Sequence, residues 1–257
     1  MSSFPWHEIL LTLPLGAALG FFGGLFGIGG GVIAIPVLVI GFGMEQQIAQ
    51  GTALVMMVPN LLIAWWRYQR HTPVAWPAML MIGLSATLTT WAVAGFASKL
   101  DPLLLRVLFS IFIGLLAVRM LVFQRRSPAS GEVLAPSLSR LAGVGMLGGA
   151  SMGLLGMGGG LVSTPILVAW CAIRQSVAQS LSLALVAPSS IVALSTYAAA
   201  NHVDWVLGLP LALGGLSSVS AGVRLAHRLS EKGLRQAFGS ILLATACWML
   251  LAPFLLA

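Results

Sequence analysis

The chain contains one unusual glycine-rich segment twice, and the two copies lie 129 residues apart without a gap. Residues 24–39 read GLFGIGGGVIAIPVLV and residues 153–168 read GLLGMGGGLVSTPILV. The same register continues downstream, where Ala49–Gln50 aligns with Ala178–Gln179. The chain is therefore a duplication, and each copy places a glycine cluster inside an apolar run. Paired Gly/Pro interruptions of this kind are the best sequence pointer to the central binding site of a transporter.

Charge is almost absent from most of the chain, which is 58% hydrophobic and only 7% charged. A soluble domain carries about a quarter charged residues. An uncharged run of about 20 residues matches a hydrocarbon core roughly 30 Å thick. The composition therefore predicts an all-α polytopic membrane protein. No basic segment precedes the first apolar run, so we expect that run to belong to the mature protein. Stretches without charge cover residues 9–44, 46–66, 71–98, 141–173, 175–203, 205–223 and 236–257.

Each half is predicted to contain four helical elements. The first is the long glycine-rich run, and the other three are ordinary spans. We expect a first membrane repeat at 1–123, a polar linker at 124–139 and a second repeat at 140–257. The predicted elements are 9–43, 47–66, 75–97 and 104–123 in the first half, and 141–172, 176–199, 203–224 and 236–256 in the second.

The glycine-rich element decides the topology. As one helix its 33 to 35 residues would extend about 50 Å, too long for a single untilted crossing. If it nevertheless crosses once, the two halves are parallel and the 13 basic residues divide about 6 to 7 between the two sides. If it returns as a hairpin or re-entrant pair, the halves are inverted and the split is about 11 to 2. The positive-inside rule favours the second arrangement. We therefore predict two inverted repeats, with the 124–139 linker in the cytoplasm.

The glycine clusters are predicted to form a binding site for an anion. Three consecutive glycines cost a helix about 1 kcal/mol each relative to alanine, and a proline follows in both copies. A break there exposes the N–H groups at the start of the next half-helix, and glycine lets a ligand approach them closely. Two such ends, related by the inverted repeat, would meet near the membrane midplane. We expect a helix break or hinge at Gly27, Pro36, Gly156 and Pro165, and substrate contacts from Gly29, Gly30, Gly31, Gln50, Asn60, Gly158, Gly159, Gly160, Ser163, Thr164, Gln179 and Ser189.

Other glycines of the first run, Gly16, Gly20 and Gly24, are predicted to serve close helix packing instead. No Asp or Glu lies deep within a predicted span, which argues against transport of Na⁺ or a metal ion. The sequence shows no metal-ligand spacing, no cofactor fingerprint and no catalytic constellation, so we expect neither metal, cofactor nor enzymatic activity.

The duplicated GxGGGxxxxP segments, at Gly27–Pro36 and Gly156–Pro165, resemble those of the TauE/SafE family of sulfite and organosulfonate exporters. The downstream Ala–Gln pairs and the central polar linker fit as well, and the resemblance covers essentially the whole chain. It implies export of a small sulfur-containing oxyanion, such as sulfite or sulfoacetate, across a bacterial inner membrane. The backbone-dipole argument independently favours an anion.

The sequence-based hypothesis is thus an alternating-access exporter whose partners are a small anion and the lipid bilayer. A homodimer is left open, and nucleic acid is not expected, since membrane proteins collect Lys and Arg in their cytoplasmic loops. An anion channel or a membrane scaffold component without transport is the alternative. The coupling ion is undetermined by the sequence.

Overall fold

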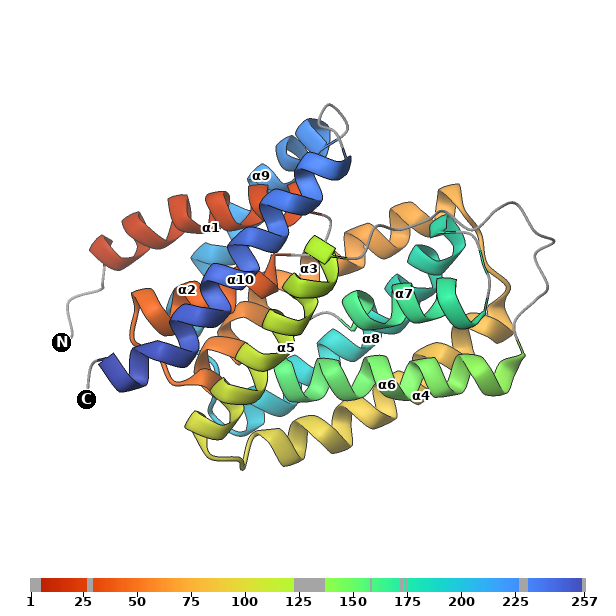
Figure 1. The fold of residues 1–257 in the computed structure, drawn as a ribbon, viewed down its shortest axis with the longest axis horizontal. Coiled ribbons are helices and arrows are strands. Elements are labelled where there is room, and N and C mark those ends of the chain that lie inside the picture. The colour runs from red at the N-terminus through yellow and green to blue at the C-terminus, as the bar shows by residue number, and fades with distance from the viewer. Residues whose placement is uncertain are drawn as a thin grey trace. The chain divides into compact units, whose positions relative to one another are not determined.

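The computed structural model describes residues 6–26, 30–122, 137–157, 159–171, 173, 175–226 and 231–255. All regular secondary structure in these residues is α-helical (Figure 1). The helices are α1 (Trp6–Phe26), α2 (Gly31–Gly41), α3 (Gln46–His71), α4 (Trp76–Ala97), α5 (Pro102–Val122), α6 (Leu138–Leu155), α7 (Gly160–Trp170), α8 (Gln175–Ala199), α9 (Trp205–Ala226) and α10 (Glu231–Leu255).

Six of these helices, α3, α4, α5, α6, α8 and α9, are long and apolar enough to cross a membrane. The apolar part of α10, Gln236–Leu251, is shorter. Outside the glycine-rich runs, the helices begin and end within five residues of the predicted boundaries. The prediction of an all-α polytopic membrane protein is confirmed.

Both glycine-rich elements are divided into a longer and a shorter helix. The first becomes α1 and α2, and the second becomes α6 and α7. α2 and α7 have 11 residues each, so each extends only about 16 Å, roughly half of a 30 Å hydrocarbon core. Neither proline ends its helix, because Pro36 lies inside α2 and Pro165 inside α7. The glycines alone interrupt the helix. A Pro removes one helical hydrogen bond, a loss that packed neighbours in a membrane protein can compensate.

The chain forms two compact units, and their boundaries differ from those of the predicted repeats. Unit 1 contains residues 1–59, 100–124 and 202–257, and unit 2 contains residues 60–99 and 125–201. The boundary at Pro59 therefore falls within α3. Each unit combines helices of the first half of the chain with helices of the second half.

In unit 1, α1 and α9 run parallel, and their backbones meet at small residues. A Cβ at Gly16, Gly20 or Gly24 would collide with the backbone of α9 at progressively later residues, Leu211, Gly215 and Val219. Ser218 of α9 also donates a hydrogen bond to the Ala17 carbonyl, at 2.5 Å. The three glycines thus lie in a helix contact, in agreement with their predicted packing role.

α3 also runs parallel to α9 in unit 1. A Cβ at Gly51 would collide with the His202 carbonyl just before α9, and Val55 lies 3.1 Å from the Cβ position of Gly208, further along α9. Since α1 and α3 share one direction, the chain between them must reverse. That reversal occurs at the glycine break, where the Cβ position of Gly30 lies 3.2 Å from the Leu19 carbonyl. Residues 11 apart in a straight helix would be separated by about 16 Å.

The second glycine-rich element reverses in the same way within unit 2. α6 and α8 run parallel, since Gly148 faces Leu185 and the Tyr197 hydroxyl donates to the Gly153 carbonyl at 3.2 Å. At the break, a Cβ on Gly159 would collide with the carbonyl of Gly148, again 11 residues earlier. α7 is therefore a short returning helix, as α2 is in unit 1.

Two further helix pairs fix the direction of the remaining spans. In unit 2, α4 lies beside α6 (Figure 1). The two helices are parallel, and Gly149 packs against Ala86. In unit 1, α5 and α10 are antiparallel. The Arg106 side chain near the start of α5 donates to the Met249 carbonyl at 3.1 Å, and Gly239 near the start of α10 faces Leu121.

Candidate functional site

The N-terminus of α7 is the best-defined polar site among the predicted residues. α6 ends at Leu155, and the following Gly156 has a φ of 63°, a left-handed conformation that glycine adopts without strain. The Gly159 carbonyl then accepts hydrogen bonds from the N–H groups of Val162 and Ser163, at 3.1 and 2.8 Å. These bonds start α7. The first N–H groups of a helix have no acceptor within the helix, and together they carry about half a positive charge.

Three hydroxyl groups meet beside this helix start. Ser163 donates to the Gly159 carbonyl at 2.8 Å and lies 3.1 Å from the Ser182 oxygen of α8. Thr164 donates to the same Ser182 oxygen at 2.8 Å. Ser163 is fully buried, and only 3% of Ser182 is exposed.

The direction of these bonds determines what the cluster offers a ligand. Ser182 accepts from Thr164, and the Ser163 oxygen, whose own proton goes to the Gly159 carbonyl, lies 3.1 Å away as an acceptor for the Ser182 proton. A serine hydroxyl has one proton to donate. The Ser182 proton can therefore be donated to Ser163 or, instead, to an anion placed at the start of α7, while Thr164 holds the Ser182 oxygen in position.

The glycines of this break have two different roles. The Cβ position of Gly159 is occupied by the backbone of Gly148, so the absence of a side chain is required for packing. The Cβ position of Gly160 is 3.7 Å from Val186 and 3.9 Å from Ser182, which is ordinary contact. A Cβ at Gly160 would thus fit without a clash, in contact with Ser182 of the hydroxyl cluster.

The corresponding break in unit 1 is lined by different side chains. Gly30 precedes α2 with a φ of 83°, and its carbonyl accepts from Ile33 and Ala34, at 3.1 and 2.9 Å. The Cβ position of Gly31 is occupied by the Met57 thioether, and that of Gly30 lies 3.0 Å from the end of Met56. In the duplicated alignment, the three hydroxyl residues of the second copy correspond to Ala34, Ile35 and Ala53. This half-helix start is apolar.

Of the other predicted contact residues, Gln179 and Ser189 share one face of α8 with Ser182, because their spacing is three and seven residues. Gln179 accepts a hydrogen bond from Tyr68 at 3.2 Å. Ser189 is buried and donates to its own helix, at the Leu185 carbonyl 2.7 Å away.

The matching positions on α3 are Gln50 and Asn60. Gln50 is fully buried, and Asn60 is 8% exposed with no partner for its Oδ1 among the described residues.

The structure thus brings together Gly159, Gly160, Ser163 and Thr164, with Gln179 and Ser189 on the α8 face toward which α7 packs. Gly27, Gly29 and Gly158 lie outside the described residues. Ser182 was not among the predicted contact residues. Its spacing of three residues from Gln179 on one helix face is the signal that could have found it. Among the described residues, no group of three or more His, Cys, Asp or Glu side chains is placed to hold a metal ion.

Apolar spans combined with short returning helices are typical of membrane transport proteins. The sequence model of the sulfite exporter TauE/SafE family matches residues 12–249, and the chain belongs to this family. A probable membrane transporter protein of Methanocaldococcus jannaschii is 30% identical, covering 95% of this chain and 97% of that relative. A probable membrane transporter protein of Xylella fastidiosa is 27% identical over 95% of both chains. YunE of Bacillus subtilis, also a probable membrane transporter, is 22% identical over 95% of this chain and 97% of its own length.

Proposed function

We propose that this TauE/SafE transporter exports a small sulfur-containing oxyanion, such as sulfite, sulfoacetate or a related organosulfonate, by alternating access. The observation that carries the proposal is the Ser163–Thr164–Ser182 cluster beside the start of α7. Fixed N–H dipoles and a directed hydroxyl proton favour a compact anion with several oxygens. The N-terminus of α2 is proposed to take part in the same site.

The inverted-repeat topology belongs to the same proposal. α5 and α10 occupy equivalent positions in the two copies, and inverted copies require equivalent spans to run in opposite directions. Their antiparallel packing supports this requirement. The reversal of the chain at both glycine breaks supports it too, since each copy then has an odd number of crossings. This arrangement puts about 11 of the 13 basic residues on one side, and we therefore propose that the 124–139 linker lies in the cytoplasm.

The membrane potential is sufficient to drive export. Outward movement of one negative charge gains about 2.3 kcal/mol per 100 mV in a cell that is negative inside. At 1.4 kcal/mol per tenfold ratio, this sustains a gradient of about 40-fold for a monoanion. Such a uniporter can lower a toxic cytoplasmic anion without a coupling ion.

The direct test is ligand-dependent stabilisation of the purified protein. A ligand that binds only the native state raises its thermal stability, by about 2.7 kcal/mol at 100 times its Kd. We expect sulfite, sulfoacetate or another sulfonate to raise the melting temperature, with sulfate, thiosulfate and taurine completing the series. Chloride salts of Na⁺, Ni²⁺ and Co²⁺ at equal ionic strength are the control. Stabilisation by one of these cations, with no response to any oxyanion, contradicts the proposal.

Transport by vesicles containing the protein then separates a carrier from an anion channel. A carrier shows a saturable rate, competition between oxyanions and counterflow. Ohmic single-channel currents identify a channel instead, and a scaffold component shows neither.

Topology is tested separately with single cysteines at positions in the 128–134 linker and at residues 230–233. Both are expected to be shielded from an impermeant external reagent in intact cells, whereas a cysteine at residues 42–44 is expected to react. Labelling of the linker and of residues 230–233 from opposite sides contradicts the inverted arrangement.

A further inference from the structure

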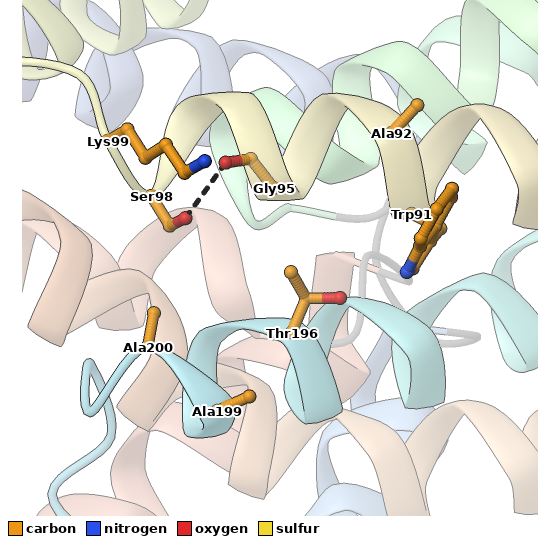
Figure 2. A pocket seen from close by; sticks show the side chains of 8 residues that line it. All are labelled: Trp91, Ala92, Gly95, Ser98, Lys99, Thr196, Ala199 and Ala200. Atoms are coloured by element: carbon orange, nitrogen blue, oxygen red, sulfur yellow. Dashed lines mark hydrogen bonds between the residues drawn. The ribbon is translucent and has the colours of Figure 1, made fainter.

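A groove in unit 2 lies apart from the α7 site, between the C-terminal ends of α4 and α8 (Figure 2). Its volume is about 380 Å³. Five residues of α4 and the turn after it form one side, and three residues of α8 and its end form the other. The lining consists of Trp91, Ala92, Gly95, Ser98, Lys99, Thr196, Ala199 and Ala200.

The middle of the groove is open because its residues are small. A Cβ placed on Gly95 would have no atom within 4 Å. Ala92 and Ala199 lie on the two sides of this opening (Figure 2). A longer side chain at Gly95 would therefore fill the groove without disturbing the helix contact.

The two ends of the groove differ in chemistry. Trp91 stands at one end, and Lys99 with Ser98 lies at the other (Figure 2). Lys99 follows Trp91 by eight positions, in the turn after α4, and eight helical residues would extend about 12 Å. Near the apolar end, Leu88 and Trp91 are 67% and 66% exposed, as expected for side chains that face acyl chains. The groove thus changes from apolar to cationic in the way that a lipid molecule changes from tail to headgroup.

Lys99 provides a charge that is not neutralised within the described part of the chain, where no carboxylate pairs with it. The acid nearest in sequence, Asp101, is already engaged, since its Oδ1 accepts from the N–H groups of Leu103 and Leu104 at 2.9 and 3.1 Å. An exposed ammonium at the end of a membrane span attracts an anionic headgroup.

The hydroxyl groups beside Lys99 favour a headgroup that carries its own donors. Ser98 donates to the Gly95 carbonyl at 3.1 Å, and Thr196 donates to the Val192 carbonyl at 2.8 Å. With their protons used, both oxygens remain acceptors. A bare oxyanion has no proton to offer them, whereas the glycerol hydroxyls of a phosphatidylglycerol headgroup do.

We propose that this groove binds one anionic phospholipid, with its phosphate at Lys99, its headgroup hydroxyls at Ser98 and Thr196, and an acyl chain along Gly95 toward Trp91. This site does not depend on the transported substrate. The lipid would lie at the ends of α4 and α8, and its binding would not require an anion at the α7 site.

The test measures thermal stabilisation of the detergent-purified protein by dioleoyl phosphatidylglycerol and by dioleoyl phosphatidylcholine. The wild type is expected to respond to phosphatidylglycerol at lower concentration. Lys99→Gln is expected to weaken the phosphatidylglycerol response about fivefold, the effect of one basic residue near a membrane surface, with phosphatidylcholine little changed. Arg224→Gln, which removes an exposed charge from the last turn of α9, is the matched control and should retain the preference.

Gly95→Leu tests the acyl-chain part of the groove. Leucine is the better helix former, so this variant is expected to fold, but it should lose most of the phosphatidylglycerol response. Gly41→Leu, at another glycine with open space around its Cβ position, should keep it. Inorganic phosphate and glycerol 3-phosphate test the headgroup without acyl chains. Neither is expected to raise the melting temperature in a way that depends on Lys99.

Two outcomes overturn the proposal. If Lys99→Gln and Gly95→Leu both bind phosphatidylglycerol as the wild type does, the lipid does not occupy this groove. If free phosphate or sulfite stabilises the wild type in a Lys99-dependent manner that Gly95→Leu does not affect, the groove is an anion site and no lipid site.

Discussion

The two glycine breaks have the same backbone design but different surroundings. Both reverse the chain, both bring a residue back beside one that lies 11 positions earlier, and both begin a helix of 11 residues. At α7 the helix start faces Ser182 and its hydroxyl partners, whereas at α2 it faces Met56 and Met57.

This difference teaches that duplication preserved the chain reversal and did not preserve the side-chain chemistry around it. Hydroxyl groups can donate to an anion, while a thioether is only a weak acceptor. The apolar start of α2 can contribute backbone N–H groups but no side-chain donor from these positions. We therefore expect substitutions around α7 to affect binding more than equivalent substitutions around α2.

The largest effect is expected for Gly160→Leu. Its Cβ fits, but the rest of the side chain fills the space in front of Ser182. We expect oxyanion affinity to fall by about 100-fold or more, corresponding to about 3 kcal/mol, with folding retained. Gly31→Leu must displace Met57 and is expected to lower stability instead. Isothermal calorimetry and melting temperatures of both variants measure the contrast. Equal loss of affinity in two well-folded variants would show that both half-helices contribute alike.

Removal of the directed hydroxyl in Ser182→Ala is expected to weaken binding about 30-fold. A hydrogen bond to a charged group contributes about 2 kcal/mol. The reciprocal change in unit 1, Ala53→Ser, should alter affinity less than about twofold. Ser195→Ala is the control, since that hydroxyl is exposed and bonds only to its own helix, at Val192. Unchanged affinity in Ser182→Ala excludes this hydroxyl as a ligand.

A stability comparison separates the two glycines that precede the short helices. Gly159→Ala places a methyl group against the backbone of Gly148, and such overpacking costs about 1–3 kcal/mol. Gly30→Ala meets the flexible end of Met56 and approaches the Leu19 carbonyl to 3.2 Å, and its φ of 83° costs an L-residue about 1–2 kcal/mol. We expect the lower melting temperature for Gly159→Ala. The reverse order would mean that backbone strain dominates packing at these breaks.

The smallest effect is expected for Thr164→Val, which keeps the shape and removes one donor to Ser182. Ser163 still lies beside the Ser182 oxygen, so affinity should fall only about fivefold, or about 1 kcal/mol. Thr164→Ser keeps the hydroxyl and should restore most of the affinity. A failure of this rescue would assign the effect of Thr164→Val to packing.

Much of the fold follows from local properties of the sequence. An apolar span in a bilayer must satisfy its backbone hydrogen bonds within itself, so run length and charge position predict where α3, α4, α5, α8 and α9 begin and end. Three adjacent glycines weaken a helix wherever they occur, and the breaks near Gly30 and Gly159 were predictable for that reason. The backbone part of the candidate site was predictable with them.

Proline predicted the helix breaks less reliably than glycine did. Pro36 and Pro165 stay within α2 and α7, because the loss of a single backbone hydrogen bond can be offset by neighbouring helices. The packing role of Gly159 could not be predicted from the sequence. Its Cβ position coincides with the backbone of Gly148, and these two residues meet only because the chain reverses between them.

By itself, the sequence determined the class of protein, the positions of the spans and the two points of reversal, because these depend on hydrophobicity and backbone propensity within short segments. Tertiary structure decided which side chains meet at those points. Ser182 joins the site only because α7 folds back against α8, and Lys99 has its groove only because the ends of α4 and α8 lie together. Contacts between distant segments depend on helix packing, and the pattern of one segment contains no information about its neighbour.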